Sequence, residues 1–224
     1  MSTPAEMQDQ IERLRLMSRG PDRFPFATRS KSDGSGSDVF WRTVPTEFRS
    51  ARIGDLTPGA VHTELSRWAN TPTDTRLPNV MIAGPVGVGK TYAACAASRR
   101  LVDRGWPFAF LSVKSMFAGR YERDIADRAA TVGLLLLDDL GSERGSDFTD
   151  ERLLWLIDER WSNGRPVIAT TNVALDQFDR VVGERVLSRL IGAGSVVLRM
   201  SGPDRRRNHD VGNVSDGTTR GALL

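Results

Sequence analysis

Hydrophobic residues in this chain fall into short runs without polar alternation, and most segments between these runs have the spacing of amphipathic helices. An uninterrupted apolar run is typical of a strand buried on both faces, as in a parallel sheet covered by helices. The runs predict five strands, at residues 79–83, 107–113, 132–140, 166–172 and 195–200. Because helical segments separate the strands, we expect an α/β fold with a five-stranded parallel sheet flanked by helices.

The predicted helices fill most of the chain between these strands. They are expected at residues 58–69, 90–104, 149–163 and 174–193, with one or two short helices within 114–130.

The two ends of the chain differ in composition from its centre. Residues 5–17 have helical periodicity, and residues 18–38 are rich in proline, serine and glycine, which is typical of a flexible linker. We therefore divide the chain into an N-terminal helix with its linker at 1–38, an α/β domain at 39–207 and a tail at 208–224. The tail is polar and glycine-rich, and we expect it to be disordered.

The segment "NVMIAGPVGVGKTYAACAASRRL" joins the first strand to a helix through the spacing G-x-x-x-x-G-K-T. Glycines let backbone N–H groups turn toward an anion, and the helix adds the positive end of its dipole. In such a loop Lys90 reaches the β- and γ-phosphates and the Thr91 hydroxyl binds Mg²⁺. A glycine-rich turn is the alternative, but the strand before and the helix after favour a nucleotide site. The residues expected around the nucleotide are Gly84, Pro85, Val86, Gly87, Val88, Gly89, Lys90, Thr91 and Tyr92.

Polar side chains end two other strands. Asp138 and Asp139 follow "LLLL", and Asn172 follows "VIATT". Ligands of an open parallel sheet bind at the carboxyl ends of its strands. We expect Asp138 to hold Mg²⁺, Asp139 to orient or deprotonate the attacking water, and Asn172 to contact the γ-phosphate or that water. The alternatives are a simple strand-end turn for the aspartates and a polar cap for Asn172.

Two groups of arginines lie beyond the fourth strand. Arg185 and Arg189 are four residues apart and share one face of a predicted helix. One of them reaching a neighbouring subunit would be an arginine finger, which stabilises charge developing on a γ-phosphate. Arg205, Arg206 and Arg207 follow the last strand, where one of them would contact phosphate in the same chain. By spacing alone, such arginines are equally well explained as surface charges.

Overall composition changes this interpretation little. The chain has 224 residues, 31 basic and 28 acidic, and a net charge of +3. All but three of the basic residues are arginine, which suits phosphate recognition, although a GC-rich coding sequence gives the same bias. The single cysteine, Cys95, cannot form a disulfide within the chain, and no run of about 18 apolar residues is present. We expect a cytoplasmic protein that makes no use of a membrane.

Three blocks, "GPVGVGKT", "LLLLDDLGSERGSDFTDERLLWLIDERWSNGRPVIATTN" and "GERVLSRL", together resemble the AAA+ P-loop ATPases of the DnaC/DnaI and IstB group. The resemblance covers about residues 40–207. It implies ATP and Mg²⁺ as cofactors, Asp138 as the magnesium ligand and Asp139 in the catalytic place.

The same resemblance assigns roles to the other polar residues. It makes Asn172 the sensor 1 residue and Arg205 the closest match to the sensor 2 arginine. It makes Arg189 the better candidate for the finger and Arg185 the second candidate. Because Arg206 and Arg207 follow directly, the register among these three stays open.

In this family the segment before the carboxylate strand lines the path of single-stranded DNA in a spiral of subunits. That segment is short here, and its candidates are Lys114, Phe117, Arg120 and Arg123. A cationic groove with an aromatic ring suits backbone contact and base stacking. The alternative is a solvated basic helix whose Phe117 belongs to the core.

The resemblance implies an ATP-dependent loader that delivers a replicative DNA helicase to single-stranded DNA and self-associates through its ATP sites into a ring or spiral. The N-terminal 38 residues match nothing recognisable; they are the candidate helicase-binding element, and the alternative is a loose appendage. Two other functions stay open: an IstB-like transposition helper that binds duplex DNA, and a regulatory nucleotide switch with little turnover.

Overall fold

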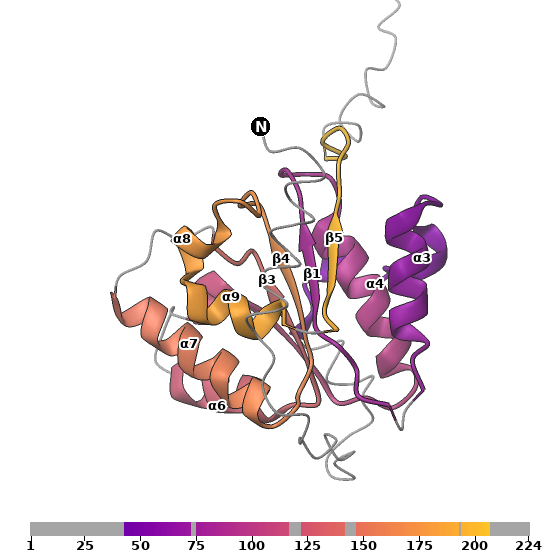
Figure 1. The fold of residues 1–224 in the computed structure, drawn as a ribbon. Helices are drawn as coiled ribbons and strands as arrows, with labels where there is room; N and C mark the ends of the chain where they lie inside the picture. The colour runs from indigo at the N-terminus through magenta and orange to yellow at the C-terminus, as the bar shows by residue number, and fades with distance from the viewer. Residues whose placement is uncertain (1–42, 73–74, 117–121, 142–146, 193, 207–224) are drawn as a thin grey trace, which may run out of the picture.

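A computed structural model describes residues 43–72, 75–116, 122–141, 147–192 and 194–206. The described strands form one sheet, in the order β2-β3-β4-β1-β5, and every neighbouring pair is parallel (Figure 1). Their bounds are β1 Val80–Ala83, β2 Phe108–Ser112, β3 Leu134–Asp138, β4 Val167–Thr171 and β5 Val196–Arg199. The predicted α/β fold with a five-stranded parallel sheet is therefore confirmed.

Helices cover both faces of this sheet. The core on one face includes residues of α3 (Ala60–Ala69) and α4 (Lys90–Val102), and the core on the other face includes residues of α6 to α9. The latter helices are α6 Glu122–Thr131, α7 Asp147–Ser162, α8 Phe178–Val182 and α9 Glu184–Leu190; the shorter elements are η1 Thr46–Phe48, η2 Ile53–Asp55 and α5 Val113–Met116. The helix predicted at 174–193 is two helices, since Gly183 has a φ of 85° between them.

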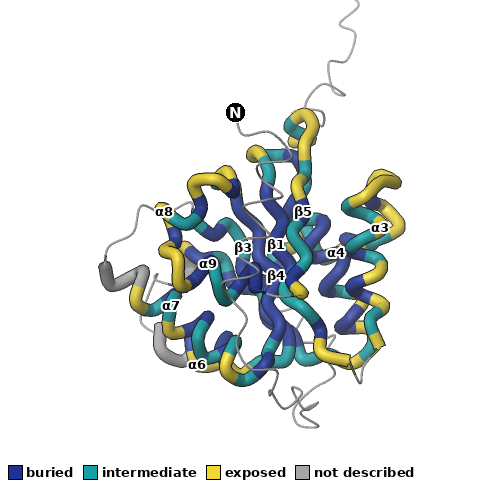
Figure 2. Tube along the Cα trace, in the orientation of Figure 1, coloured by how far each residue is buried: buried dark blue, intermediate teal, exposed yellow. Residues whose placement is uncertain are grey.

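Strand β1 shows why the apolar runs lack polar alternation. Val80 and Ile82 belong to the core beside α3 and α4, whereas Met81 and Ala83 belong to the core beside α6 to α9. Both faces of the strand are thus buried, and the central strands form the dark interior of Figure 2.

One arginine lies fully inside this interior. The guanidinium of Arg160, on α7, donates hydrogen bonds to the carbonyls of Ala129, Val132, Gly133 and Pro166 at 2.6–3.3 Å. These carbonyls lie at the end of α6 and just before β3 and β4. A buried charge is tolerated when hydrogen bonds replace its hydration, so Arg160 ties together the segments that enter the two strands.

The predicted N-terminal helix at 5–17, the linker at 18–38 and the tail at 208–224 lie outside the described residues. None of the helices in the described segments is long and apolar enough to cross a membrane.

Candidate functional site

The loop from Gly84 to Gly89 joins β1 to α4 and requires glycine at several positions. A Cβ atom added at Gly84 would lie 2.2 Å from the carbonyl oxygen of Met200. Gly87 and Gly89 have φ angles of 81° and 97°, which other residues rarely adopt. Close backbone packing and left-handed conformations are what a phosphate-binding loop needs, so these glycines fit an anion cradle at the start of α4.

Lys90 opens α4 and is largely buried, with 7% of its surface exposed. Its Nζ donates hydrogen bonds to the Pro85 carbonyl at 2.7 Å and to Oδ1 of Asn172. Burial lowers the pKa of Lys90, while the charges of Asp139 and Asp138 act in the opposite direction. The ammonium group is therefore held within the loop, beside two carboxylates.

Asp138, at the end of β3, connects three elements. One of its carboxylate oxygens accepts hydrogen bonds from the Thr91 hydroxyl at 2.8 Å and from the Thr170 hydroxyl at 2.7 Å. Burial raises the pKa of Asp138, and the hydrogen bonds from Thr170 and Thr91 partly oppose that shift. Thr170, in β4, is a site residue that sequence reasoning missed, because a threonine inside a strand gives no local signal.

These residues fit Mg²⁺ bound together with a nucleotide. The described residues contain no cluster of three or more metal-ligating side chains. Mg²⁺ with nucleotides is usually held by one or two protein oxygens, with substrate phosphates and water completing its shell. The adjacent oxygens of Thr91 and Asp138 supply such a pair.

Asp139 has a φ of 62°, and it is the one non-glycine residue with positive φ among those described. Its backbone N–H donates to the Thr170 hydroxyl at 3.0 Å, and its carboxylate accepts a hydrogen bond of 2.6 Å from the Asn172 side-chain amide. Asn172 therefore bridges Lys90 and Asp139. The structure brings together the lysine, both aspartates and the asparagine that the sequence had placed in one site.

Residues after β5 return to the phosphate loop. The Arg205 N–H donates to the carbonyl of Gly87 at 3.0 Å, and its guanidinium donates to the Thr57 hydroxyl at 3.2 Å. After burial, the positive charge of Arg206 also lowers the pKa of Lys90, so Arg206 lies near the site as well. Both arginines are thus close to the loop, whereas Arg207 lies outside the described residues.

Tyr92, also predicted to lie at the nucleotide, points toward the segment before α3. Its hydroxyl donates to the Asp55 carboxylate at 2.9 Å. Burial and this hydrogen bond both raise the pKa of Tyr92. The first turn of α4 is therefore bordered by residues 55–57 as well as by residues 205–206.

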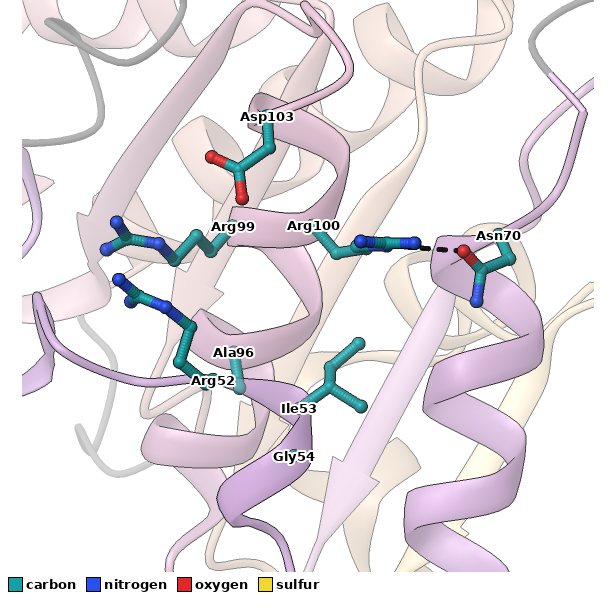
Figure 3. A pocket seen from close by; sticks show the side chains of 8 residues that line it. All are labelled: Arg52, Ile53, Gly54, Asn70, Ala96, Arg99, Arg100 and Asp103. Carbon is teal, nitrogen blue, oxygen red and sulfur yellow. Dashed lines mark hydrogen bonds between the residues drawn. The ribbon is translucent and has the colours of Figure 1, made fainter.

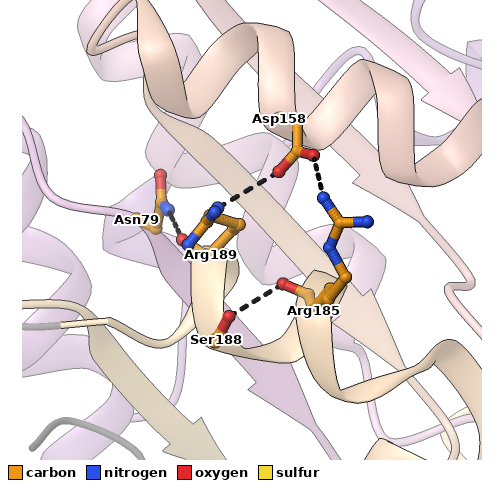
Figure 4. Close-up of polar contacts among 5 residues, drawn as sticks. All are labelled: Asn79, Asp158, Arg185, Ser188 and Arg189. Atoms are coloured by element: carbon orange, nitrogen blue, oxygen red, sulfur yellow. Dashed lines mark hydrogen bonds and ion pairs between the residues drawn. The ribbon is translucent and has the colours of Figure 1, made fainter. Parts of the chain in front are cut away.

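Arg185 and Arg189 lie on α9 and share the carboxylate of Asp158 on α7 (Figure 4). The carbonyl of Arg189 accepts a hydrogen bond of 3.0 Å from the side chain of Asn79. Asn79 immediately precedes β1 and also pairs with the backbone of Val167 and Val196, so it marks the amino ends of the strands.

The backbone of the finger candidate therefore lies at the amino ends of the strands, and the phosphate loop lies at their carboxyl ends. The five residue steps from Asn79 to Gly84 span about 16 Å of extended chain. That is longer than an arginine side chain, so Arg189 is poorly placed to reach the nucleotide of its own subunit.

The candidate DNA-binding residues are only partly described. Lys114 is exposed on α5. Phe117, Arg120 and the side chain of Arg123 lie outside the described residues, and their role stays a prediction.

A separate cavity of about 350 Å³ lies at the other end of α4 (Figure 3). Arg52, Arg99 and Arg100 are among its lining residues, and Arg99 donates to the carbonyl of Arg49. Arg99 lies nine residue steps along the helix from Lys90, which is about 14 Å, so this cavity is not the phosphate site. Arg99 and Arg100 lie in the last turn of α4, where basic residues stabilise a helix end.

Comparison with known proteins assigns this chain to a family. Residues 58–198 match the family described as IstB-like ATP binding protein. The chain is 31% identical over 163 residues to a protein named as an ATP-binding protein in an insertion sequence of Mycobacterium tuberculosis, covering 66% of this chain and 62% of that protein. It is 25% identical over 126 residues to the replicative helicase loader DnaC of Escherichia coli, covering 52% of this chain and 51% of that protein. The matches thus span about half to three fifths of these relatives.

Solved structures show the same fold at lower identity. A crystal structure of DnaI aligns with a TM-score of 0.64 and 22% identity, over 77% of this chain and all of that one. A crystal structure of the DnaC helicase loader aligns with a TM-score of 0.60 and 22% identity, over 70% of this chain and all of that one.

The raised pKa of Asp138 leads to a prediction about stability. Because burial raises that pKa, the carboxyl group favours folding most when it is protonated, and this contribution is lost as pH rises through the folded-state pKa. Asp138→Asn removes the charge and keeps an oxygen for the two threonines. We expect it to raise the melting temperature of the nucleotide-free protein at pH 7, while weakening Mg²⁺-dependent nucleotide binding.

Thermal unfolding followed at several pH values measures this effect. The gain should shrink in acid, where the carboxyl group of the unsubstituted protein is itself protonated. Asp127→Asn, which changes an exposed residue of α6, is the matched control and should shift the melting temperature little. A melting temperature lowered by Asp138→Asn at pH 7 would contradict the interpretation.

Proposed function

The chain belongs to the IstB-like ATP-binding family of AAA+ P-loop proteins. From its nucleotide site and its similarity to the replicative helicase loader DnaC, we propose that it is an ATP-driven helicase loader. In this proposal ATP binding assembles copies of the chain into a ring or spiral. The assembly delivers a replicative DNA helicase to single-stranded DNA, and ATP hydrolysis releases it.

The nucleotide chemistry follows from the residues at the carboxyl edge of the sheet. Lys90 and the glycine-rich loop would bind the phosphates, and Thr91 with Asp138 would hold Mg²⁺, which would neutralise phosphate charge. Asp139 orients the attacking water and accepts its proton, and Asn172 holds Asp139 in place through a hydrogen bond of 2.6 Å. Arg205, whose backbone N–H donates to the Gly87 carbonyl, would serve as the sensor arginine, with the neighbouring Arg206 as the alternative.

The observation that carries the assembly step is the position of Arg189. Lys90, Mg²⁺ and a sensor arginine would each meet part of the charge on the phosphates, and an arginine finger would add a further cation at the γ-phosphate. Since the Arg189 backbone lies at the amino ends of the strands, Arg189 would supply that cation to a neighbouring subunit. Hydrolysis then depends on contact between subunits, as it does where an arginine finger acts in trans.

Two kinds of relative favour two kinds of partner. Similarity to the replicative helicase loader DnaC supports a helicase and single-stranded DNA. The second candidate is a transposition helper that acts on duplex DNA, and the 31% identity to an insertion-sequence protein favours it. In either case residues 1–38 are the proposed partner-binding element.

Removal of the Asp139 charge should separate nucleotide binding from hydrolysis. Asp139→Asn keeps the shape of the side chain and removes the carboxylate that activates water, so we expect turnover to fall by about 10²-fold or more. Affinity for ATP should be nearly unchanged, whereas Lys90→Ala should weaken it. Steady-state ATPase assays and titration with a fluorescent ATP analogue measure the two effects, and normal turnover by Asp139→Asn would remove Asp139 from its assigned role.

The partner is tested by capture on the immobilised 224-residue chain. We expect the chain with ATP to retain a purified replicative helicase and to bind single-stranded DNA more tightly than duplex DNA, with strong salt dependence. A chain lacking residues 1–38 should bind ATP but lose the helicase. Retention of an insertion-sequence transposase together with preference for duplex DNA would instead favour the second candidate.

A further inference from the structure

Asp158 on α7 contacts both finger candidates at once (Figure 4). One of its oxygens accepts a hydrogen bond of 3.1 Å from Nε of Arg189, and the other accepts one of 3.3 Å from Nη2 of Arg185. The two arginines differ in exposure: 30% of the Arg189 side chain is exposed, against 70% for Arg185. The carboxylate is therefore shared between a half-buried arginine and a solvent-exposed one.

Trp161 adds a second restraint on Arg189. The Cζ atom of Arg189 lies 4.0 Å from the centroid of the Trp161 ring, which is the geometry of a cation–π contact. Trp161 and Asp158 are three residues apart on α7 and so share one face of that helix. Together they fix one edge and one face of the Arg189 guanidinium.

The edge that Asp158 takes matters for phosphate recognition. A guanidinium binds a phosphate most strongly when two parallel N–H groups donate hydrogen bonds to it. Asp158 occupies Nε of Arg189, and among the described residues no hydrogen-bond acceptor is paired with its terminal nitrogens. In Arg185 the terminal Nη2 is the atom that pairs with Asp158, and no ring contact of Arg185 is present among the described residues.

We propose that Asp158 and Trp161 are positioning residues that orient the terminal nitrogens of Arg189 toward the ATP of a neighbouring subunit. The inference rests on the proposed trans mechanism and selects Arg189, rather than Arg185, as the finger. A guanidinium already held in place loses less conformational freedom when it binds phosphate, so the restraint favours hydrolysis.

Asp158→Ala in the 224-residue chain tests the proposal. ATPase activity per subunit is measured against protein concentration at saturating ATP, together with ATP affinity and melting temperature. We expect the concentration-dependent activity to fall by about 10-fold or more, with little change in ATP affinity or in melting temperature. Glu159→Ala is the matched control, since this neighbouring carboxylate pairs with Asn163 and should leave activity unchanged.

A double-substitution cycle separates positioning from a structural role. If Asp158 acts through Arg189, then Asp158→Ala should cause no further loss in a chain that already carries Arg189→Ala. Trp161→Leu should behave in the same way. A general structural defect would instead lower ATP affinity and add to the loss in both backgrounds.

The outcomes also distinguish this inference from the proposed function. If Arg189→Ala keeps its concentration-dependent activity, the trans mechanism fails and the inference fails with it. If Arg189→Ala abolishes that activity while Asp158→Ala leaves it unchanged or raises it, the trans mechanism stands and the positioning role is overturned.

Discussion

The rest of the site depends on the two hydrogen bonds that the Asp138 carboxylate accepts. This carboxylate accepts hydrogen bonds from Thr91 at the start of α4 and from Thr170 in β4, while belonging itself to β3. One oxygen atom thereby links the first turn of α4 to β3 and β4. The neighbouring residues follow from it, because Asp139 continues the same strand end and Asn172 follows Thr170 by two residues. Burial that raises the pKa of Asp138 is the cost of this arrangement in the nucleotide-free protein.

The parallel sheet also separates the proposed finger arginine from the phosphate loop of the same chain. All strands of a parallel sheet end at the same edge, and the phosphate loop, Asp138 and Asn172 meet there. The carbonyl of Arg189 is bound by Asn79, just before the opposite edge, and its guanidinium is held on α7 by Asp158 and Trp161. In the proposed function an arginine so placed acts on a different subunit's nucleotide, and assembly and hydrolysis are then parts of one process.

The parts of the site that the sequence predicted are those encoded locally. The glycine spacing before Lys90 and the aspartates after an apolar run each lie within a few residues, so the sequence pattern alone assigns their positions. Contacts between distant segments carry no such local pattern. Asn79 meets Arg189 across 110 positions, and Thr170 meets Asp138 across 32. Arg160 lies among charged residues in "DERW", a pattern that predicts solvent exposure, yet tertiary packing buries it completely.

The central claim is that two subunits build one hydrolytic site, and mixing two inactive variants tests it most directly. The Arg189→Ala chain keeps its own phosphate loop and carboxylates, and the Asp139→Asn chain keeps Arg189 and binds ATP. We predict that each variant alone hydrolyses ATP slowly and that an equal mixture regains part of the activity, since Arg189 of one chain completes the site of the other. A mixture no more active than its two components, with both chains folded and binding ATP, would contradict the account.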